Sequence, residues 1–574
     1  MQPLTPFIFL KNDEPTPSLA TTLEGHSILL NPLLNKGTAF TLEERADLKL
    51  VGFLPPTPMT LEQQIEISYG EFQRCSSPIH QYMFLRALQE RNEVLYFSLL
   101  ERHLEEMLPI IYTPTIGDVI QRFSSLCIHS RGLSLSPHNI QEVEALIQNY
   151  PLQDIRMVVV TDSSAILGIG DQGYGGINIT IGKLALYTVA GGMNPFHTLP
   201  VGLDVGTNRA DLLNNSLYIG TRTKRLTGSS YSDFLDRFVE AIHKQHPQAV
   251  IQWEDFAKEV AFSVLERYRK TLPSFNDDIQ GTGAVALAGV LSACRIRGEK
   301  LQDQWIVIHG AGAGGIGVAW AFKEGMKKEG LTEEKARARI FVTDSQGLLT
   351  TDRKMEAYKI PYAQDPAILK GWRFQNQIPN LIETLGNSQA TILIGLSGQG
   401  GAFSERVVQT MLAHTKQPII FPLSNPTSAS EAAPDSLLKW TQGNALIATG
   451  SPFPPVSLNG ISKKIGQGNN AFIFPGLGLG TSLSKAAEVT DSMVLAAAYA
   501  LHEYTQSSYT LRLYPSISEL QQVSMHVTVR VIEQAIRDGV SLLDAAACNN
   551  LPEYVRSHFW RAGYLPIKSI KHSP

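Results

Sequence analysis

The sequence predicts an α/β fold with two parallel α/β units, one inserted into the other, behind a helical N-terminal region. Three observations support this prediction. The chain has 574 residues, too many for one ordinary core. In its middle part, short apolar runs that end in polar residues alternate with helical segments, as in parallel sheets. Before that part, apolar residues recur at helical spacing.

Composition indicates a folded globular protein, since 43% of the residues are hydrophobic and 18% are charged. The net charge of −4 gives no reason to expect a nucleic-acid partner. No run of about 18 apolar residues and no secretory signal are present, so we expect no membrane partner. The four cysteines are isolated, which favours a reducing compartment, the cytoplasm.

The N-terminal region, 1–129, is expected to be mainly helical. Between Thr60 and Met107, apolar residues recur three and four positions apart among Glu, Gln and Arg. This stripe has more apolar surface than a small helical region needs to pack on the rest of the chain. The region is therefore our candidate for contacts between copies of the chain.

The first α/β unit is expected to comprise 130–276 and 468–538, with 539–574 as a short C-terminal tail. Its candidate strands are DIRMVVVTD at 154–162, TLPVGLDVG at 198–206 and QAVIQWED at 248–255. The second unit is expected to span 277–467. Its candidate strands are QWIVIHG, ARIFVTD, ATILIGLSG, QPIIFPLSNP and ALIATG.

A glycine-rich loop predicts that the second unit is a Rossmann-type dinucleotide domain. Gly310, Gly312 and Gly315 follow the strand QWIVIH and precede a helical segment. In this pattern the first glycine permits a tight turn, the second admits the pyrophosphate, and the third lets strand and helix pack closely. The N-terminus of the helix then offers N–H groups to the phosphates.

A second G-x-G-x-x-G pattern, GIGDQG at 168–173, is interpreted differently. The carboxylate of Asp171 would point towards a bound phosphate and repel it. The segment also lacks an acidic residue at the end of a following strand that could bind the ribose. We predict a tight turn near a different ligand.

Asp344 ends the second strand of the dinucleotide unit and predicts NAD as the cofactor. A carboxylate there can accept hydrogen bonds from the ribose hydroxyls and would repel a 2′-phosphate. Ser345 and Gln346 add no positive charge. Arg353 and Lys354 follow closely, however, and either could fold back onto a phosphate, which leaves NADP as the alternative.

Two acidic pairs predict a site for Mn²⁺ or Mg²⁺. Glu254 and Asp255 follow one strand, and Asp277 and Asp278 precede a helix. Hard divalent cations need several oxygen ligands, and strand ends in α/β folds are where sites form. The alternative is helix capping by Asp277 or Asp278. His243 and His246 lie in a polar helical stretch and are interpreted as solvent-exposed, not as zinc ligands.

The chain resembles the malic enzymes from about residue 28 to its C-terminus. The motifs that carry this resemblance are YTPTIG at 112–117, VVVTD at 158–162, GKLALYT at 182–188, LPVGLDVGTN at 199–208, WEDF at 253–256, SFNDDIQGTG at 274–283, PLSNPT at 422–427, ATGSPF at 448–453 and NNAFIFPG at 469–476. Their order and spacing cover nearly the whole chain. The resemblance implies an oxidoreductase that decarboxylates L-malate to pyruvate and CO₂ while reducing NAD.

The resemblance also implies a role for each matching residue. Lys183 is the general base for the C2 hydroxyl, and Tyr112 is the general acid for C3. The metal ligands are Glu254, Asp255 and Asp278, with Asp277 beside them as a further catalytic residue. Asn425, Asn469 and Asn470 contact the substrate, and Asn425 also lies near the nicotinamide. Without the motifs, Lys183 would be taken for a surface lysine and Tyr112 for a core aromatic. Family members are commonly dimers or tetramers, so a homodimer or homotetramer is expected.

One position departs from the family. The family strand VVTD is usually followed by a glycine, an acid and an arginine that clamps a malate carboxylate, but here Ala165 takes the place of that arginine. The related malolactic enzymes, which convert L-malate to L-lactate with tightly held NAD, also lack it. Two alternatives therefore stay open, a malolactic enzyme and a non-catalytic relative that binds nucleotide.

Overall fold

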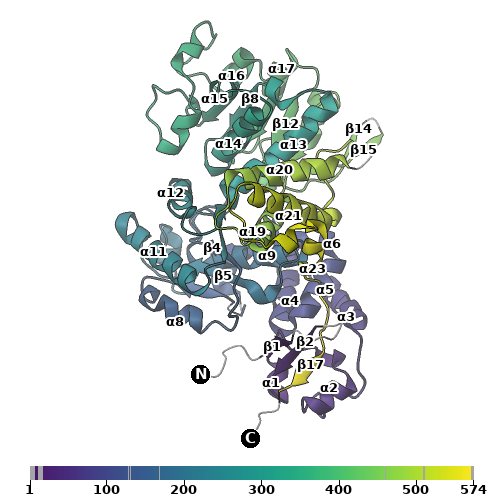
Figure 1. Cartoon of the computed structure of the whole chain (residues 1–574). Helices are drawn as coiled ribbons and strands as arrows, with labels where there is room; N and C mark the ends of the chain where they lie inside the picture. The colour runs from purple at the N-terminus through teal and green to yellow at the C-terminus, as the bar shows by residue number, and fades with distance from the viewer. Residues whose placement is uncertain are drawn as a thin grey trace. The chain divides into compact units, whose positions relative to one another are not determined.

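A computed structural model of the chain describes residues 7–10, 17–126, 128–129, 131–166, 168–458, 460–507 and 511–570. They form two compact units. Unit 1 comprises Met1–Ser163, Gln172–Ala249 and His558–Pro574, and unit 2 comprises Ser164–Asp171 and Val250–Ser557. Figure 1 shows the elements of both units, which are described separately below.

Unit 1 begins with the predicted helical region. Its helices are α1 (His26–Leu29), α2 (Leu42–Asp47), α3 (Leu61–Arg74), α4 (Pro78–Arg91), α5 (Glu93–Arg102), α6 (Leu104–Ile111) and α7 (Thr115–Arg122). The sequence sets where the longer ones start. The Thr60 side chain accepts a hydrogen bond from the N–H of Gln63, and Gln63 returns one to the N–H of Thr60, which caps α3.

A parallel sheet in unit 1 contains β3 (Leu133–Leu135), β5 (Thr198–Leu203) and β4 (Met157–Thr161) in that order. The helices of this part are α8 (Val143–Gln148), α9 (Ile177–Val189), α10 (Ala210–Leu213) and α11 (Gly228–Gln245). Every residue of α9 is buried, and α9 packs against β4 and β5. A polar side chain on α9 is therefore inside the fold whatever its position on the helix.

The two ends of the chain form a small sheet that was not predicted. Strand β2 (Ser18–Thr21) pairs antiparallel with β1 (Phe7–Leu10) and parallel with β17 (Ile567–Ser569). Figure 1 shows the three strands side by side. The N-terminal region, predicted to be mainly helical, and the predicted C-terminal tail thus also contribute strands. Strands of three or four residues are too short to leave a periodic pattern in the sequence, and β17 pairs with a strand over 500 positions away.

Unit 2 contains a seven-stranded sheet in the order β10–β9–β8–β11–β12–β13–β16, in which the last strand, β16, is Gly466–Gln467. Its five long strands coincide with the five predicted runs: β8 (Ile306–His309), β9 (Ile340–Asp344), β11 (Ile392–Gly395), β12 (Ile419–Pro422) and β13 (Leu446–Thr449). They run parallel, whereas β10 (Gly347–Leu348) pairs antiparallel with β9. The chain leaves β8 on one side towards β9 and returns on its other side as β11. Such a reversal of strand order marks where ligands bind in doubly wound folds.

Helices surround this sheet and continue beyond it. They are α13 (Thr282–Arg297), α14 (Ala313–Lys328), α15 (Glu333–Arg337), α16 (Leu381–Ser388), α17 (Glu405–Leu412), α18 (Pro434–Trp440), α19 (Phe474–Leu483), α20 (Asp491–Gln506), α21 (Leu520–Arg537) and α22 (Ala545–Cys548). The helix α23 (Leu551–His558) follows. Among the described residues, the helical stretch Asp277–Arg297 is long and apolar enough to cross a membrane, but 83% of that window is buried inside the fold. Such burial is typical of a core helix.

Unit 2 also contains a pair of parallel strands, β6 (Val250–Trp253) and β7 (Ser274–Asn276), with α12 (Lys258–Tyr268) between them. Trp253 and Asn276 are opposite each other at the ends of the two strands. Both predicted acidic pairs directly follow these strand ends, so the two pairs lie close together.

Candidate active site

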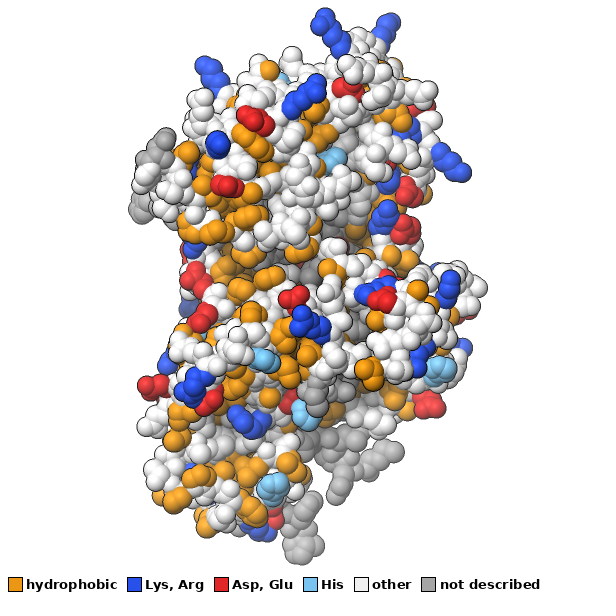
Figure 2. Space-filling model, turned by 180° about the vertical axis from the view of Figure 1, so that it is seen from behind, with side chains coloured by type: hydrophobic (Ala, Val, Ile, Leu, Met, Phe, Trp, Pro, Cys, Tyr) orange, Lys and Arg blue, Asp and Glu red, His pale blue; other side chains and the backbone are white. Residues whose placement is uncertain are grey.

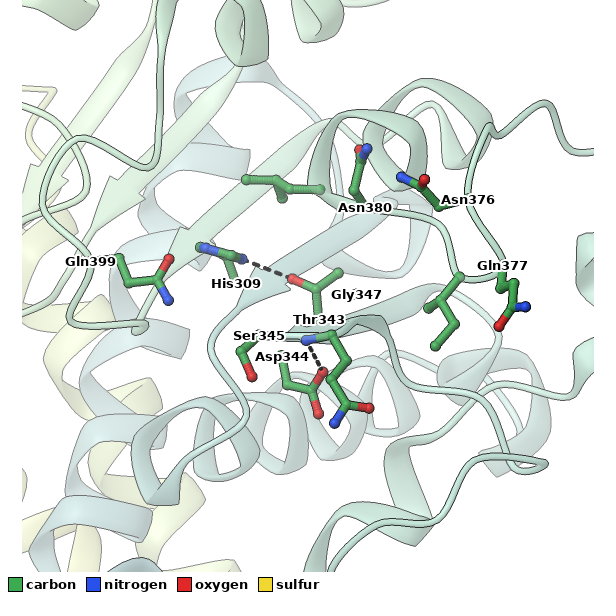
Figure 3. A pocket seen from close by; sticks show the side chains of 12 residues that line it. His309, Thr343, Asp344, Ser345, Gly347, Asn376, Gln377, Asn380 and Gln399 are labelled. Carbon is green, nitrogen blue, oxygen red and sulfur yellow. Dashed lines mark hydrogen bonds between the residues drawn. The ribbon is translucent and has the colours of Figure 1, made fainter.

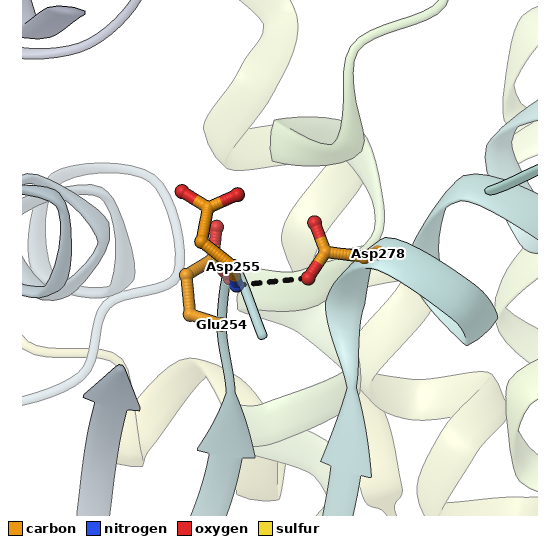
Figure 4. Close-up of side chains that lie close together, drawn as sticks. All are labelled: Glu254, Asp255 and Asp278. Carbon is orange, nitrogen blue, oxygen red and sulfur yellow. Dashed lines mark hydrogen bonds between the residues drawn. The ribbon is translucent and has the colours of Figure 1, made fainter. Parts of the chain in front are cut away.

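Three carboxylates gather where β6 and β7 end. Glu254 and Asp255 follow β6, and Asp278 lies in the π-helical turn after β7. One oxygen of each lies within 4.8 Å of the others, and the Asp255 N–H donates to Asp278 Oδ2 at 2.8 Å (Figure 4). Glu254 and Asp255 are buried and Asp278 is half-buried, so holding these anions this close is costly unless a cation joins them. The oxygen donors suit Mg²⁺ or Mn²⁺, as predicted.

The backbone of this cluster argues for a ligand role over a capping role. The π-helical turn Asp277–Gly281 is capped by Asn276, whose side chain accepts a hydrogen bond from the Ile279 N–H at 2.9 Å. The alternative of capping by Asp277 or Asp278 is therefore wrong. Asp255 has a φ of 55°, in the left-handed region that Asp adopts more readily than most residues other than glycine.

Asp277 and Asn470 lie together, although 193 positions separate them. Asn470 Nδ2 donates to Asp277 Oδ2 and to Thr282 Oγ1, each at 3.1 Å. Asn469 is buried, and its side chain accepts a hydrogen bond from the Ala471 N–H at 2.9 Å. The NNAF motif thus begins a short helical turn and also reaches the acidic pair.

The predicted base and acid meet inside unit 1. Lys183 on α9 is only 1% exposed, so the interpretation as a surface lysine is wrong. Its Nζ lies 5.2 Å from the ring centre of Tyr112, which follows α6 and is 7% exposed. Gly182 makes this approach possible, because a Cβ there would come within 2.7 Å of the Ile111 carbonyl oxygen. An amine and a phenol thus lie near each other in a buried setting.

Ala165 lies against the acidic cluster. Its N–H donates to the Asp255 carbonyl oxygen at 3.0 Å. The side chain that replaces the family arginine therefore starts beside a predicted metal ligand and carries no charge.

The second glycine pattern forms a turn, as predicted. Ile166 and Gly170 are bridged in antiparallel fashion, and Gly170 and Gly173 both have positive φ. A Cβ on Gly168 would lie 2.3 Å from the Asn425 carbonyl oxygen, so this turn packs against a predicted substrate residue. Asn425 follows β12, and its Oδ1 accepts a hydrogen bond from Ser451 Oγ at 2.6 Å.

The first glycine pattern has the geometry of a dinucleotide site. Gly310, with a φ of 119°, turns the chain out of β8. A Cβ on Gly315 would lie 1.8 Å from the Gly310 carbonyl oxygen, whereas a Cβ on Gly312 would meet nothing within 4 Å. Gly310 and Gly315 therefore let the strand and the helix pack closely. Gly312 leaves open space at the N-terminus of α14, where a pyrophosphate fits.

A cavity of about 520 Å³ lies at the ends of β8 and β9. Figure 3 shows the side chains that line it, among them His309, Thr343, Asp344, Asn376 and Gln377. His309 Nδ1 lies 3.0 Å from Thr343 Oγ1. Sequence patterns did not predict the contribution of 376–381, because this segment approaches Asp344 only through the fold.

Two cations pair with the Asp344 carboxylate. Arg353 is one of the two that the sequence analysis named as able to fold back, whereas Lys359 was not singled out there. Burial opposes ionisation of Asp344. The hydrogen bonds from Arg353 and the Gln346 N–H, together with the two positive charges, nevertheless lower its pKa below the usual value.

Family comparisons agree with this geometry. The model described as malic enzyme, N-terminal domain, matches residues 89–269, and the model described as malic enzyme, NAD binding domain, matches residues 279–536. The chain belongs to the malic enzyme family. The predicted family is thereby confirmed, and the NAD-binding model confirms the expected nicotinamide cofactor.

Several malic enzymes resemble this chain over nearly its full length. The NAD-dependent malic enzyme of Pseudomonas savastanoi is 44% identical over 94% of this chain and 96% of its own. That of Pseudomonas aeruginosa is 45% identical over the same shares. The Entamoeba histolytica malic enzyme structure has a TM-score of 0.55 at 22% identity, covering 90% of this chain and 91% of its own. The predicted α/β fold class is confirmed.

The role of each functional residue remains a prediction. The structure brings Glu254, Asp255 and Asp278 together, and separately Lys183 and Tyr112. His243 and His246 belong to no described group of possible metal ligands. Of the cysteines, Cys75, Cys294 and Cys548 are free thiols, and Cys127 lies outside the described residues.

Proposed function

We propose that this protein is an NAD-dependent malic enzyme that converts L-malate to pyruvate and CO₂ with a divalent metal ion. The relatives with about 44% identity carry that name. The observation that carries the proposal is the buried Lys183 amine beside the Tyr112 phenol. A protein that only bound nucleotide would need neither a placed base nor a placed acid.

Glu254, Asp255 and Asp278 would hold the metal ion, and the loop Gly310–Gly315 with Asp344 would hold NAD. A bound divalent ion supplies a Lewis acid for the oxygen of the substrate carbonyl, and NAD accepts the hydride from C2. Asn425, Asn469 and Asn470 would orient the substrate with amide hydrogen bonds. Asp277, fixed by Asn470, would keep the acidic group in place.

Lys183 acts in the first half of the reaction and Tyr112 in the second. Burial disfavours the charged form of an amine, so Lys183 can take the proton of the C2 hydroxyl as the hydride leaves C2. The oxidised product then loses its β-carboxylate as CO₂ and becomes an enolate. Tyr112 gives its proton to C3 of that enolate, and pyruvate results.

The missing arginine favours a second candidate function. With Ala165 beside Asp255, a malate carboxylate loses a contact worth about 1.5–3 kcal/mol. Malolactic enzymes also lack that arginine, and they return the hydride to pyruvate to give L-lactate. This chain keeps the YTPTIG motif with its tyrosine, which favours the malic reaction.

One incubation separates the candidates. The protein is mixed with L-malate, NAD⁺ and Mn²⁺, the absorbance of NADH is followed, and the products are identified. NADH with pyruvate supports the proposal, and L-lactate without NADH selects the malolactic alternative. Nucleotide binding without formation of pyruvate or L-lactate would indicate that the protein is a non-catalytic relative.

We also propose the organisation predicted from the sequence. The NAD-binding domain would span 277–467, within a substrate and metal domain of 130–276 and 468–538, preceded by the N-terminal region 1–129 and followed by a tail at 539–574. The N-terminal region carries exposed apolar side chains, among them Leu30, Val51 and Phe53, which suits contacts in a homodimer or homotetramer. Sedimentation showing only monomer at micromolar concentration would contradict that assembly.

The proposed compartment is the cytoplasm, and the proposed partners are small molecules. On the face shown in Figure 2, basic and acidic side chains are interspersed. Such a surface suits a metabolic enzyme better than a nucleic-acid partner. Fractionation of cells that express the full chain would test the compartment.

A further inference from the structure

A buried carboxylate joins the loops that follow β11 and β12. Glu431, in the segment before α18, is fully buried. Its Oε1 accepts hydrogen bonds from the N–H and the Oγ of Ser397, each at 2.8 Å, and from Ser424 Oγ at 2.6 Å. Its Oε2 accepts a longer one from the Ser424 N–H at 3.4 Å. Four donors from two loops therefore converge on one anion.

Both serine hydroxyls also accept a hydrogen bond from the backbone after β11. Ser424 Oγ accepts one from the Gly398 N–H at 2.9 Å, and Ser397 Oγ accepts one from the Gln399 N–H at 3.2 Å. Each oxygen thus holds a backbone N–H while its hydrogen points to Glu431. The loop after β11 is in this way fixed to the loop after β12 through a single side chain.

The fold makes room for this carboxylate at some cost. A Cβ on Gly395, the last residue of β11, would lie 2.5 Å from both Cδ and Oε2 of Glu431. Among the described residues, no lysine or arginine pairs with Glu431, so hydrogen bonds alone balance its charge. An apolar side chain of similar volume could fill such a space without the cost of burying a charge. The carboxylate is therefore better explained by what it positions than by stability.

The group that it positions is Asn425, which directly follows Ser424. The Asn425 side chain is held from the other side, where Ser451 Oγ, just beyond β13, donates to its Oδ1 at 2.6 Å. The segments after three neighbouring strands, β11, β12 and β13, thus meet around one amide. The carboxyl ends of parallel strands are where a dinucleotide binds in such sheets.

We propose that Glu431 is a positioning residue for the nicotinamide half of NAD. Its charge holds the Ser397 and Ser424 loops together and so sets the place of the Asn425 amide. Glu431 itself touches neither substrate nor cofactor. The proposal rests on the proposed function, since it takes Asn425 as a contact of the nicotinamide.

The fluorescence lifetime of NADH bound to the full-length protein tests the proposal without turnover. The nicotinamide ring emits for longer when a protein holds it still, and at saturation the signal does not depend on affinity. In Glu431→Gln, bound NADH should lose most of the increase in lifetime that the wild-type protein gives. The amide keeps the size of the side chain, but it has one acceptor oxygen, and its NH₂ group opposes at least one of the four donors. With L-malate and NAD⁺, kcat of this variant should fall about a hundredfold.

Three serine variants locate the effect. Ser397→Ala and Ser424→Ala each remove a hydroxyl that donates to Glu431, so each should also shorten the lifetime. Combining Ser424→Ala with Glu431→Gln should add little to either change alone, because both break one network. Ser430→Ala is the matched control, since Ser430 is buried in the same loop but its Oγ donates to the Ala432 carbonyl oxygen at 3.2 Å. Its lifetime and kcat should stay at the wild-type values.

The proposal is overturned if Glu431→Gln gives the wild-type lifetime, or if the wild-type protein binds NADH without lengthening its lifetime. Fully additive effects of Glu431→Gln and Ser424→Ala would also overturn it. If Glu431→Gln does not fold or cannot be saturated, Ser397→Ala and Ser430→Ala decide, and equal lifetimes in these two variants would refute the proposal. A protein that shows the expected lifetimes but does not oxidise malate would refute the proposed function alone. An active malic enzyme without them would refute this inference alone.

Discussion

Replacing Gly315 with alanine tests how closely β8 and α14 must approach to form the nucleotide loop. A Cβ at that position would lie 1.8 Å from the Gly310 carbonyl oxygen and 2.8 Å from its carbonyl carbon. Both atoms belong to the backbone, so no flexible side chain can move aside. Strand end and helix must separate by about 1.6 Å to restore an ordinary contact of 3.4 Å.

That displacement sets the expected magnitudes. Overpacking of a close-packed site costs about 1–3 kcal/mol of unfolding free energy. A shift of the phosphate-binding loop by more than 1 Å should reduce kcat/KM for NAD about a hundredfold. Denaturant unfolding measures the first effect, and initial rates at saturating malate measure the second.

Gly314→Ala is the matched control. Its Cβ would meet the side chains of Thr282 at 3.3 Å and Leu396 at 3.4 Å, which can yield, and the Asp278 carbonyl oxygen at 3.7 Å, an ordinary contact. We expect a loss of well under about 1 kcal/mol, as for a surface change away from strained contacts. Equal stability and equal NAD kinetics in both variants would refute the close-packing argument.

Three further predictions concern the metal, the substrate and the proton transfers. Asp278→Asn should weaken Mn²⁺ binding at least about tenfold, because it removes one anionic ligand; unchanged affinity by calorimetry would exclude Asp278 as a ligand. Ala165→Arg should lower KM for malate about tenfold or more, since it adds a charge-assisted contact; a KM that does not fall would exclude that contact. Lys183→Ala should abolish malate oxidation, and Tyr112→Phe should slow exchange of the pyruvate methyl protons with ²H₂O while Mn²⁺ binding stays intact. A fully active Lys183→Ala protein would contradict the assigned roles.

Much of unit 2 could be predicted because its strands are buried on both faces. Such strands appear as continuous apolar runs, and all five predicted runs became β8, β9, β11, β12 and β13. The loop Gly310–Gly315 was also predictable, since each glycine has a local geometric reason. Lys183 and Tyr112 were found only through the family motifs, because nothing in helical periodicity marks a buried lysine as functional.

The remaining features depend on contacts between distant segments. Strand β17 pairs with β2, and Asn470 bonds to Asp277, across separations that no local pattern records. Lys359 reaches Asp344 from 15 positions away, beyond the nearer candidate Lys354. Each of these contacts depends on tertiary structure that brings distant segments of the chain together.

We expect oxidation and decarboxylation of malate to occur together and to need the metal ion that Glu254, Asp255 and Asp278 are proposed to hold. The most direct test measures NADH, CO₂ and pyruvate in one reaction of the full-length protein with L-malate and NAD⁺, with Mn²⁺ or with a chelator. The proposed function predicts equal amounts of all three products with Mn²⁺ and none with the chelator. Release of CO₂ without NADH, or full activity in the chelator, would contradict it.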